Sequence, residues 1–139
     1  MSVSEFWTVE AIVASDLRPL PPHETPAGVI ADALDVRDAA AVRASVRRHR
    51  PDVVVHLAAI VTPGRGSNRE LEWQVDVGGT KNVLEACLEA GVRKLVYTSS
   101  GAAYGYHADN PEWLTESHPV RGNQAFAYSW HKRLVEEML

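Results

Sequence analysis

The alternation of strand-like and helix-like segments is the feature of this sequence that most constrains its fold. Short apolar runs at 11–15, 52–59 and 94–100 are bounded by turn residues and predict strands, and a weaker strand is predicted within 29–36. Helical patterns separate and follow them. This order, with almost wholly apolar strands, is typical of an α/β protein in which helices flank a parallel sheet and bury both of its faces.

The helix boundaries carry their own signals. Asp38 is a suitable N-cap for a helix that runs to His49. A long helix is expected over 69–90, with Gly91 as its stop, and a last helix within 123–139. No linker or repeat interrupts the pattern, so residues 1–139 are interpreted as a single domain.

Composition narrows the class of protein. Hydrophobic residues make up 45% and charged residues 23% of the 139 residues, which is ordinary for a soluble globular domain. The net charge of −4 argues against binding to nucleic acid or to an anionic membrane. Cys87 is the single cysteine, and no apolar run approaches the length of a membrane span, so we expect a cytoplasmic protein. The six histidines have no metal-ligand spacing, and no metal is expected.

A tyrosine and a lysine stand four residues apart in "YSWHK". On a helix, Tyr128 and Lys132 would share one face. An ammonium close to a phenol lowers the pKa of the phenol, so the pair suggests a general base. Taken alone, this spacing is common on ordinary amphipathic helices.

Other candidates follow predicted strands, where ligands sit in parallel sheets. Ser99 and Ser100 end the strand in "YTSSGAAYG" and can bind a substrate oxygen or cap backbone amides. Small residues, Ala58 and Ala59, end "VVVHLAA" and permit close approach of a ligand. We interpret His56, inside that apolar run, as a hydrogen-bonded core residue.

Two acids follow the early strands. Asp16 can accept hydrogen bonds from the two hydroxyls of an adenosine ribose, and its charge favours NAD over NADP, a preference that Arg18 softens. Asp35 can face the adenine edge. The alternative for both is an exposed acid in a turn.

The order of these pieces resembles the extended short-chain dehydrogenase/reductase family, the NAD-dependent epimerase/dehydratases. The matching stretches are "SD", "LDV", "VVVHLAA", "DVGGTKNVLEACLEAGVRKLVYTSSGAAYG" and the Tyr-x-x-x-Lys of "YSWHK". The resemblance runs from about residue 11 to the end, and 75–105 is its most specific part. It implies an NAD(P)-binding Rossmann fold.

The resemblance also implies roles for individual residues. Tyr128 matches the general acid/base, Lys132 matches the lysine that lowers the pKa of this tyrosine and binds the nicotinamide ribose, and Ser100 matches the residue that orients the substrate oxygen. On the cofactor side the matching residues are Asp16 for the ribose, Asp35 and Val36 for adenine, and Ala58 and Ala59 beside the cofactor. The implied chemistry is hydride exchange between nicotinamide and a hydroxyl or carbonyl carbon of a small-molecule substrate.

Three departures from the family stand out. Asp76 occupies the usual asparagine position of the "NVxGT" motif, which replaces a donor and acceptor with an acceptor only. Trp130 and His131 stand between the tyrosine and lysine, where they face away from that pair. The third departure is that the family's first strand, its GxxGxxG loop and its substrate domain have no counterpart in 1–139, so the chain is interpreted as a truncated dinucleotide-binding domain.

This reading leaves several functions open. The first is a fragment of an epimerase, dehydratase or reductase acting on a substrate like a nucleotide sugar, with weak or no turnover alone. The second is a non-catalytic binding module that dimerises through helices 69–90 and 123–139, and the third is a truncated gene product. Without the first strand, we expect the strands at 11–15 and 52–59 to pair directly.

Overall fold

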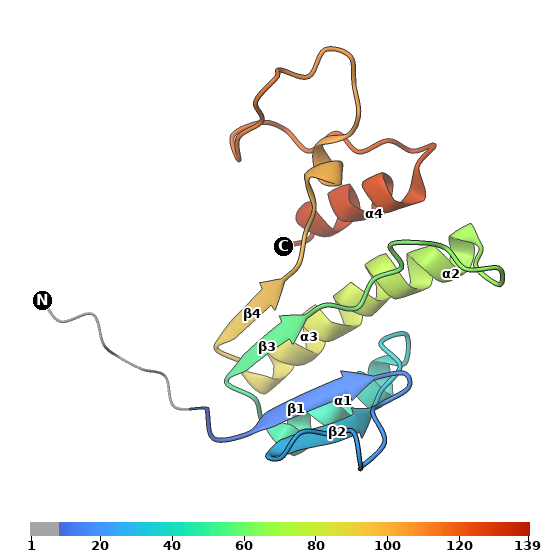
Figure 1. The fold of residues 1–139 in the computed structure, drawn as a ribbon. Coiled ribbons are helices and arrows are strands. Elements are labelled where there is room, and N and C mark those ends of the chain that lie inside the picture. Colours follow the sequence, from blue (N-terminus) through green and yellow to red (C-terminus); the bar gives the residue numbers. More distant parts are fainter. Residues whose placement is uncertain (1–8) are drawn as a thin grey trace, which may run out of the picture. The chain divides into compact units, whose positions relative to one another are not determined.

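The computed structural model describes residues 9–139 and divides the chain into two compact units, 1–35 and 36–139. Figure 1 shows the elements of each unit. The first unit contains β1 (Ile12–Asp16) and β2 (Val29–Ala33), which pair in parallel with Ile12 opposite Val29 and Asp16 opposite Ala33. The loop 17–28 joins them and ends at Gly28, whose φ of 81° is a conformation that glycine adopts readily.

The second unit is built around another parallel pair, β3 (Val53–His56) and β4 (Lys94–Tyr97). In this pair Val53 lies opposite Lys94 and His56 opposite Tyr97. The crossover connection between them contains a helical run, as is usual for parallel strands. The carboxyl ends of β3 and β4 therefore lie at one edge of the sheet, which places His56 and Tyr97 side by side.

Helix α1 (Ala39–His49) begins where the sequence predicts, because the Asp38 side chain accepts hydrogen bonds from the Ala40 and Ala41 amides. The helix packs on α3 (Thr80–Ala90). Its Val42 is 1% exposed, and Arg43 forms ion pairs with Glu85 and Glu89 on α3. These contacts hold the helical run that carries part of the candidate site.

The segment predicted as one helix over 69–90 is helical throughout but not uniform. It consists of α2 (Arg69–Trp73), a π-helical turn η1 (Gln74–Gly79) and α3. The wide turn contains Gly78 and Gly79, which favour a regular α-helix least among residues other than proline. A Cβ at Gly79 would lie 2.6 Å from Val36 Cγ2, so this glycine permits close packing on the segment after β2. The predicted stop at Gly91 is confirmed by its left-handed conformation, with φ 69°.

The carboxyl-terminal helix α4 (Ala127–Glu136) docks on the short 3-10 turn η2 (Gly101–Tyr104) that follows β4. The fully buried Ser129 donates a hydrogen bond to the Ala102 carbonyl at 2.7 Å. From α2, Arg69 donates to the carbonyls of Gln124 and Ala125, just before α4. Helix α4 is thus fixed at the carboxyl end of β4.

Two sequence-based expectations about the strands are wrong. Within the described residues, the hydrogen-bonded sheets are β1–β2 and β3–β4, so β1 and β3 do not pair directly. Instead, β1 pairs with β2 in the first unit, and β3 pairs with β4 in the second. The expectation that the strands are buried on both faces is also wrong, since Val53 and Val55 on β3 are 42% and 56% exposed. A two-stranded sheet with helices on one side leaves its other face open. The class itself, parallel strands flanked by helices, is confirmed.

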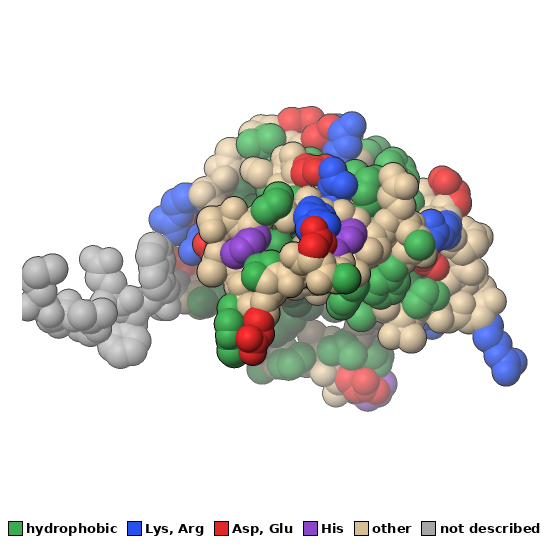
Figure 2. All heavy atoms as spheres, turned by 90° about the horizontal axis from the view of Figure 1, so that it is seen from above, with side chains coloured by type: hydrophobic (Ala, Val, Ile, Leu, Met, Phe, Trp, Pro, Cys, Tyr) green, Lys and Arg blue, Asp and Glu red, His purple; other side chains and the backbone are tan. Residues whose placement is uncertain are grey.

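The surface mixes charges of both signs. Figure 2 shows acidic and basic side chains interspersed with apolar ones on one face. Over the part of the chain that the structure describes, no helix has the length and apolar character needed to cross a membrane.

Candidate functional site

A buried group of polar contacts in the second unit surrounds Lys132 on α4. Its side chain is buried, with 3% of the residue exposed. The ammonium donates hydrogen bonds to the Tyr97 hydroxyl at 2.8 Å and to the Thr98 carbonyl at 2.7 Å. Burial lowers the pKa of Lys132, while the negative charges of Asp76 and Glu136 raise it.

Tyr128 lies one helical turn before Lys132 and is half-buried. The Lys132 ammonium is 5.5 Å from the centroid of its ring. The helix therefore places the two side chains together on one face, within electrostatic reach of each other.

A second tyrosine, Tyr97, lies closer to Lys132 than Tyr128 does, with 4.5 Å between the ammonium and the ring centroid. Sequence reasoning missed it. Burial raises the pKa of Tyr97 beyond its usual range, and the charges of Asp76, Tyr128 and Glu136 add to this effect. Tyr97 is therefore neutral at physiological pH and cannot be the general base. Its place at the carboxyl end of β4, beside the "SS" motif, is the signal that could have identified it.

His56 supports Tyr97 from the neighbouring strand. The two rings stack with centroids 5.9 Å apart. His56 Nε2 lies 3.0 Å from Thr80 Oγ1, and the Thr80 hydroxyl donates to the Asp76 carbonyl, so Nε2 carries the proton and donates to Thr80. Burial lowers the pKa of His56 to about 4, and Lys132 contributes, so the ring is neutral. The interpretation of His56 as a hydrogen-bonded core residue is confirmed.

Ser100 lies just past β4, at the start of η2. Its hydroxyl oxygen accepts a hydrogen bond from the Ala102 amide at 3.2 Å, which is the capping role considered for this serine. Within the described chain, Ser100 forms no hydrogen bond with Tyr128 or Lys132. Its hydroxyl hydrogen still has the capacity to donate to a ligand.

Two of the departures from the family pattern meet in the core. Asp76 Oδ2 lies 2.9 Å from His131 Nδ1, and the two side chains are 5% and 6% exposed. The other oxygen, Asp76 Oδ1, accepts the Ile60 amide at 2.7 Å. The His131 side chain is directed toward this buried carboxylate. No local sequence pattern indicates this pair, because its members lie 55 residues apart.

The small residues after β3 lie in the loop that this pair anchors. Ala58 is exposed and Ala59 half-buried. Because the Ile60 amide is bound by Asp76, the loop is fixed to η1 one residue beyond Ala59. The loop thus offers small side chains on a held backbone.

The adenosine-side candidates are divided between the two units. Asp16 ends β1, is exposed, and accepts the Arg18 amide at 2.7 Å, so it does form the turn considered as the alternative. Asp35 closes the first unit and Val36 opens the second. The Val36 carbonyl is held at 2.8 Å by the Asn82 amide of α3.

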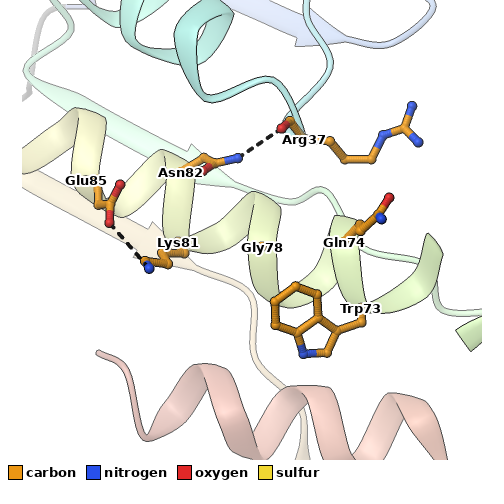
Figure 3. A pocket seen from close by; sticks show the side chains of 7 residues that line it. All are labelled: Arg37, Trp73, Gln74, Gly78, Lys81, Asn82 and Glu85. Atoms are coloured by element: carbon orange, nitrogen blue, oxygen red, sulfur yellow. Dashed lines mark hydrogen bonds and ion pairs between the residues drawn. The ribbon is translucent and has the colours of Figure 1, made fainter. Parts of the chain in front are cut away.

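A separate hollow of about 460 Å³ lies along the helical run (Figure 3). Arg37, Trp73, Gln74, Gly78, Lys81, Asn82 and Glu85 line it. None of the catalytic candidates is among these residues. We therefore place the candidate site at the ends of β3 and β4, where the buried polar groups meet. Among residues 9–139, no cluster of His, Cys, Asp or Glu has an arrangement that could hold a metal.

Comparison with known proteins agrees with this class of fold. Residues 7–139 match the NAD dependent epimerase/dehydratase family. UDP-glucose 4-epimerase from Erwinia amylovora is 33% identical over 106 residues, which cover 76% of this chain and 31% of that enzyme. The 3beta-hydroxysteroid-dehydrogenase/decarboxylase isoform 2 of Arabidopsis thaliana is 34% identical over 90 residues, 63% of this chain and 15% of that protein.

A solved structure also matches the fold of this chain. A short-chain dehydrogenase/reductase superfamily protein from Agrobacterium tumefaciens, with bound NAD, aligns with a TM-score of 0.70 and 31% identity over 91% of this chain and 35% of the other. The fold and site define a parallel α/β protein of the short-chain dehydrogenase/reductase type. The chain belongs to the NAD dependent epimerase/dehydratase family, and it spans about a third of the length of the first curated relatives it matches.

Proposed function

We propose that this chain is part of the NAD-binding domain of an enzyme that exchanges hydride between nicotinamide and a hydroxyl or carbonyl carbon. The observation that carries the proposal is the buried Lys132 ammonium, fixed at the end of β4 and 5.5 Å from the Tyr128 ring. Both units belong to this one domain in the proposal. Its substrate is a small molecule similar to a nucleotide sugar, as the name of the Erwinia relative suggests.

The residues present fit NAD at two places. Lys132 uses two of its three N–H donors within the protein, which leaves one for a ribose hydroxyl. Asp16 offers an exposed carboxylate at the end of a strand, the acceptor that an adenosine ribose requires. A carboxylate there repels a 2′-phosphate, so NAD is favoured over NADP. Asp35 and Val36 are assigned to the adenine side, and Ala58 and Ala59 to the wall beside the cofactor.

NAD, when bound, supplies the hydride acceptor and donor. The chain's own residues move and hold the proton. Tyr128, with the Lys132 ammonium 5.5 Å from its ring, takes the proton from a substrate hydroxyl or returns it to a carbonyl. Ser100 donates a hydrogen bond to the same substrate oxygen and so orients it. Tyr97, which stays protonated, leaves Tyr128 as the base.

The test is an NMR titration of the whole chain with NAD, because chemical shifts report binding even when it is weak. We expect the side-chain signals of Lys132 and Asp16 to shift on adding NAD, with smaller shifts on adding NADP. Asp16→Asn should bring the two cofactors closer in affinity, because the repulsion of the 2′-phosphate is lost. Absence of any shift at Lys132 and Asp16 at millimolar NAD would contradict the proposal.

We also propose that copies of this chain associate through the helices at 69–90 and 123–139. Large apolar side chains are exposed in the first of these segments, with Trp73 at 45% and Leu88 at 73%. Exposed side chains of this size favour burial against a partner. A dimer without affinity for NAD would favour the binding-module function over the enzymatic one.

We also propose that the protein is cytoplasmic, in keeping with its single, buried thiol at Cys87.

A further inference from the structure

The direction of the Lys132 side chain is set by the end of β4. A lysine ammonium has three N–H donors. Two of them are used by the Tyr97 hydroxyl and the Thr98 carbonyl, at 2.8 and 2.7 Å. With the residue 3% exposed, little water is available to replace either acceptor. The direction of the third N–H follows from where these two acceptors lie.

Tyr97 is itself held in place by a series of contacts across the second unit. Its ring stacks on His56, with 28° between the planes. His56 binds Thr80, and the fully buried Thr80 binds the Asp76 carbonyl in η1. The series runs from the helical segment through β3 to β4 and ends at the ammonium on α4. A tyrosine supported in this way can hold a charged partner with little loss of side-chain freedom on binding.

The chemistry of the two rings suits this task. Burial keeps Tyr97 protonated, so its oxygen accepts from the ammonium as a neutral group. His56 is also neutral and adds no positive charge beside Lys132. Neither ring therefore carries a positive charge that would repel the Lys132 ammonium.

We propose that Tyr97 is a positioning residue for Lys132, and that its hydroxyl directs the remaining N–H of the ammonium toward Tyr128 and the ligand. The ligand side of this statement rests on the proposed function. Tyr97 transfers no proton in the reaction and acts only through Lys132. Its role is distinct from that of Tyr128, although both rings lie near the same ammonium.

The experiment follows the titration of the lysines by NMR, with ¹³C at the ε carbon. The chain has three lysines, and the exposed Lys81 and Lys94 serve as internal references. In Tyr97→Phe the charged form of Lys132 loses an acceptor, so its titration midpoint should fall by about one pH unit. Tyr106→Phe makes the same chemical change at a tyrosine that is 69% exposed and should leave Lys132 as in the wild type.

A second measurement needs no variant. In the wild-type chain, the ζ carbon of Tyr97 should show a step at the midpoint of the Lys132 titration. An unchanged Lys132 midpoint in a folded Tyr97→Phe chain, or a Tyr97 signal that ignores Lys132, would overturn the proposal. If both effects are seen but NAD causes no shift, Tyr97 still positions Lys132 and only the enzymatic function fails.

Discussion

His56 shows how one buried residue links the candidate site to the stability of the chain. The ring is 5% exposed and gives its proton to Thr80, so the folded state holds it in the neutral form. The same ring stacks on Tyr97, which binds Lys132. Protonation of His56 would place a second positive charge beside the ammonium.

Stability should therefore fall as the pH is lowered through a defined window. The pKa of His56 is about 4 in the folded chain and 6.5 ordinarily. Between these values the unfolded state binds the proton and the folded state does not, so the free energy of unfolding rises with pH. Lowering the pH from 7 to 4 should cost about 3 kcal/mol from this group, at 1.36 kcal/mol per pKa unit. Urea denaturation at a series of pH values measures it.

The control for this prediction is His56→Gln, which keeps a donor for Thr80 but does not titrate. Its pH dependence between 4 and 6.5 should be shallower than that of the wild type by the contribution of one histidine. Equal slopes for the two chains would show that His56 is not held neutral by the fold.

At the scale of elements, the π-helical turn η1 decides which groups meet. It carries Asp76 into the core, where the carboxylate binds the Ile60 amide after β3 and His131 on α4. One side chain thus ties together the helical run, the loop that contains Ala58 and Ala59, and the helix that contains Tyr128 and Lys132. Breaking this junction should loosen the site as well as the fold.

Variants at the junction should differ in a characteristic order. Asp76→Ala leaves the Ile60 amide and the His131 ring buried without their acceptor, which should cost about 3 kcal/mol or more. Asp76→Asn keeps an acceptor for Ile60 and offers a donor to the other tautomer of His131, so about 1 kcal/mol is expected. His131→Ala leaves the carboxylate with one partner and should resemble Asp76→Ala. Chemical denaturation measures all three; equal losses for Ala and Asn at position 76 would contradict this account.

At the scale of the whole molecule, exposed apolar surface is the main feature. Val53 and Val55 on β3 and Ile12 and Ile30 in the first unit are each more than 40% exposed, as is Leu88 on α3. Such surface is costly in water, and exposed strands are open to pairing with other chains. We therefore expect copies of this chain to associate with one another.

Light scattering should show a dimer that depends on the helical segment. Leu88→Glu places a charge at the proposed contact and should shift the chain toward monomer. Leu17→Glu makes the same change at a leucine that is 61% exposed in the first unit and should leave the dimer intact. Equal effects of both variants would indicate nonspecific association through exposed apolar surface.

Local patterns in the sequence by themselves determined the secondary-structure elements and the fold class of this protein. The apolar runs, the Asp38 cap, the Gly91 stop and the spacing of Tyr128 and Lys132 predicted the elements, the α/β class and the shared face of one helix. These features depend on residues a few positions apart, whose geometry follows from the period of the helix or strand. The resemblance to a family extended them to the candidate site.

Only the tertiary structure decided the rest. It formed the π-helical turn within the expected helix. It also brought Asp76 to His131 and Tyr97 to Lys132, which are pairs 35 or more positions apart in the sequence. The separate pairing of β1 with β2 and β3 with β4 likewise departed from the expected order. No local period fixes such contacts, because they depend on which buried polar groups must find partners once the apolar faces have packed.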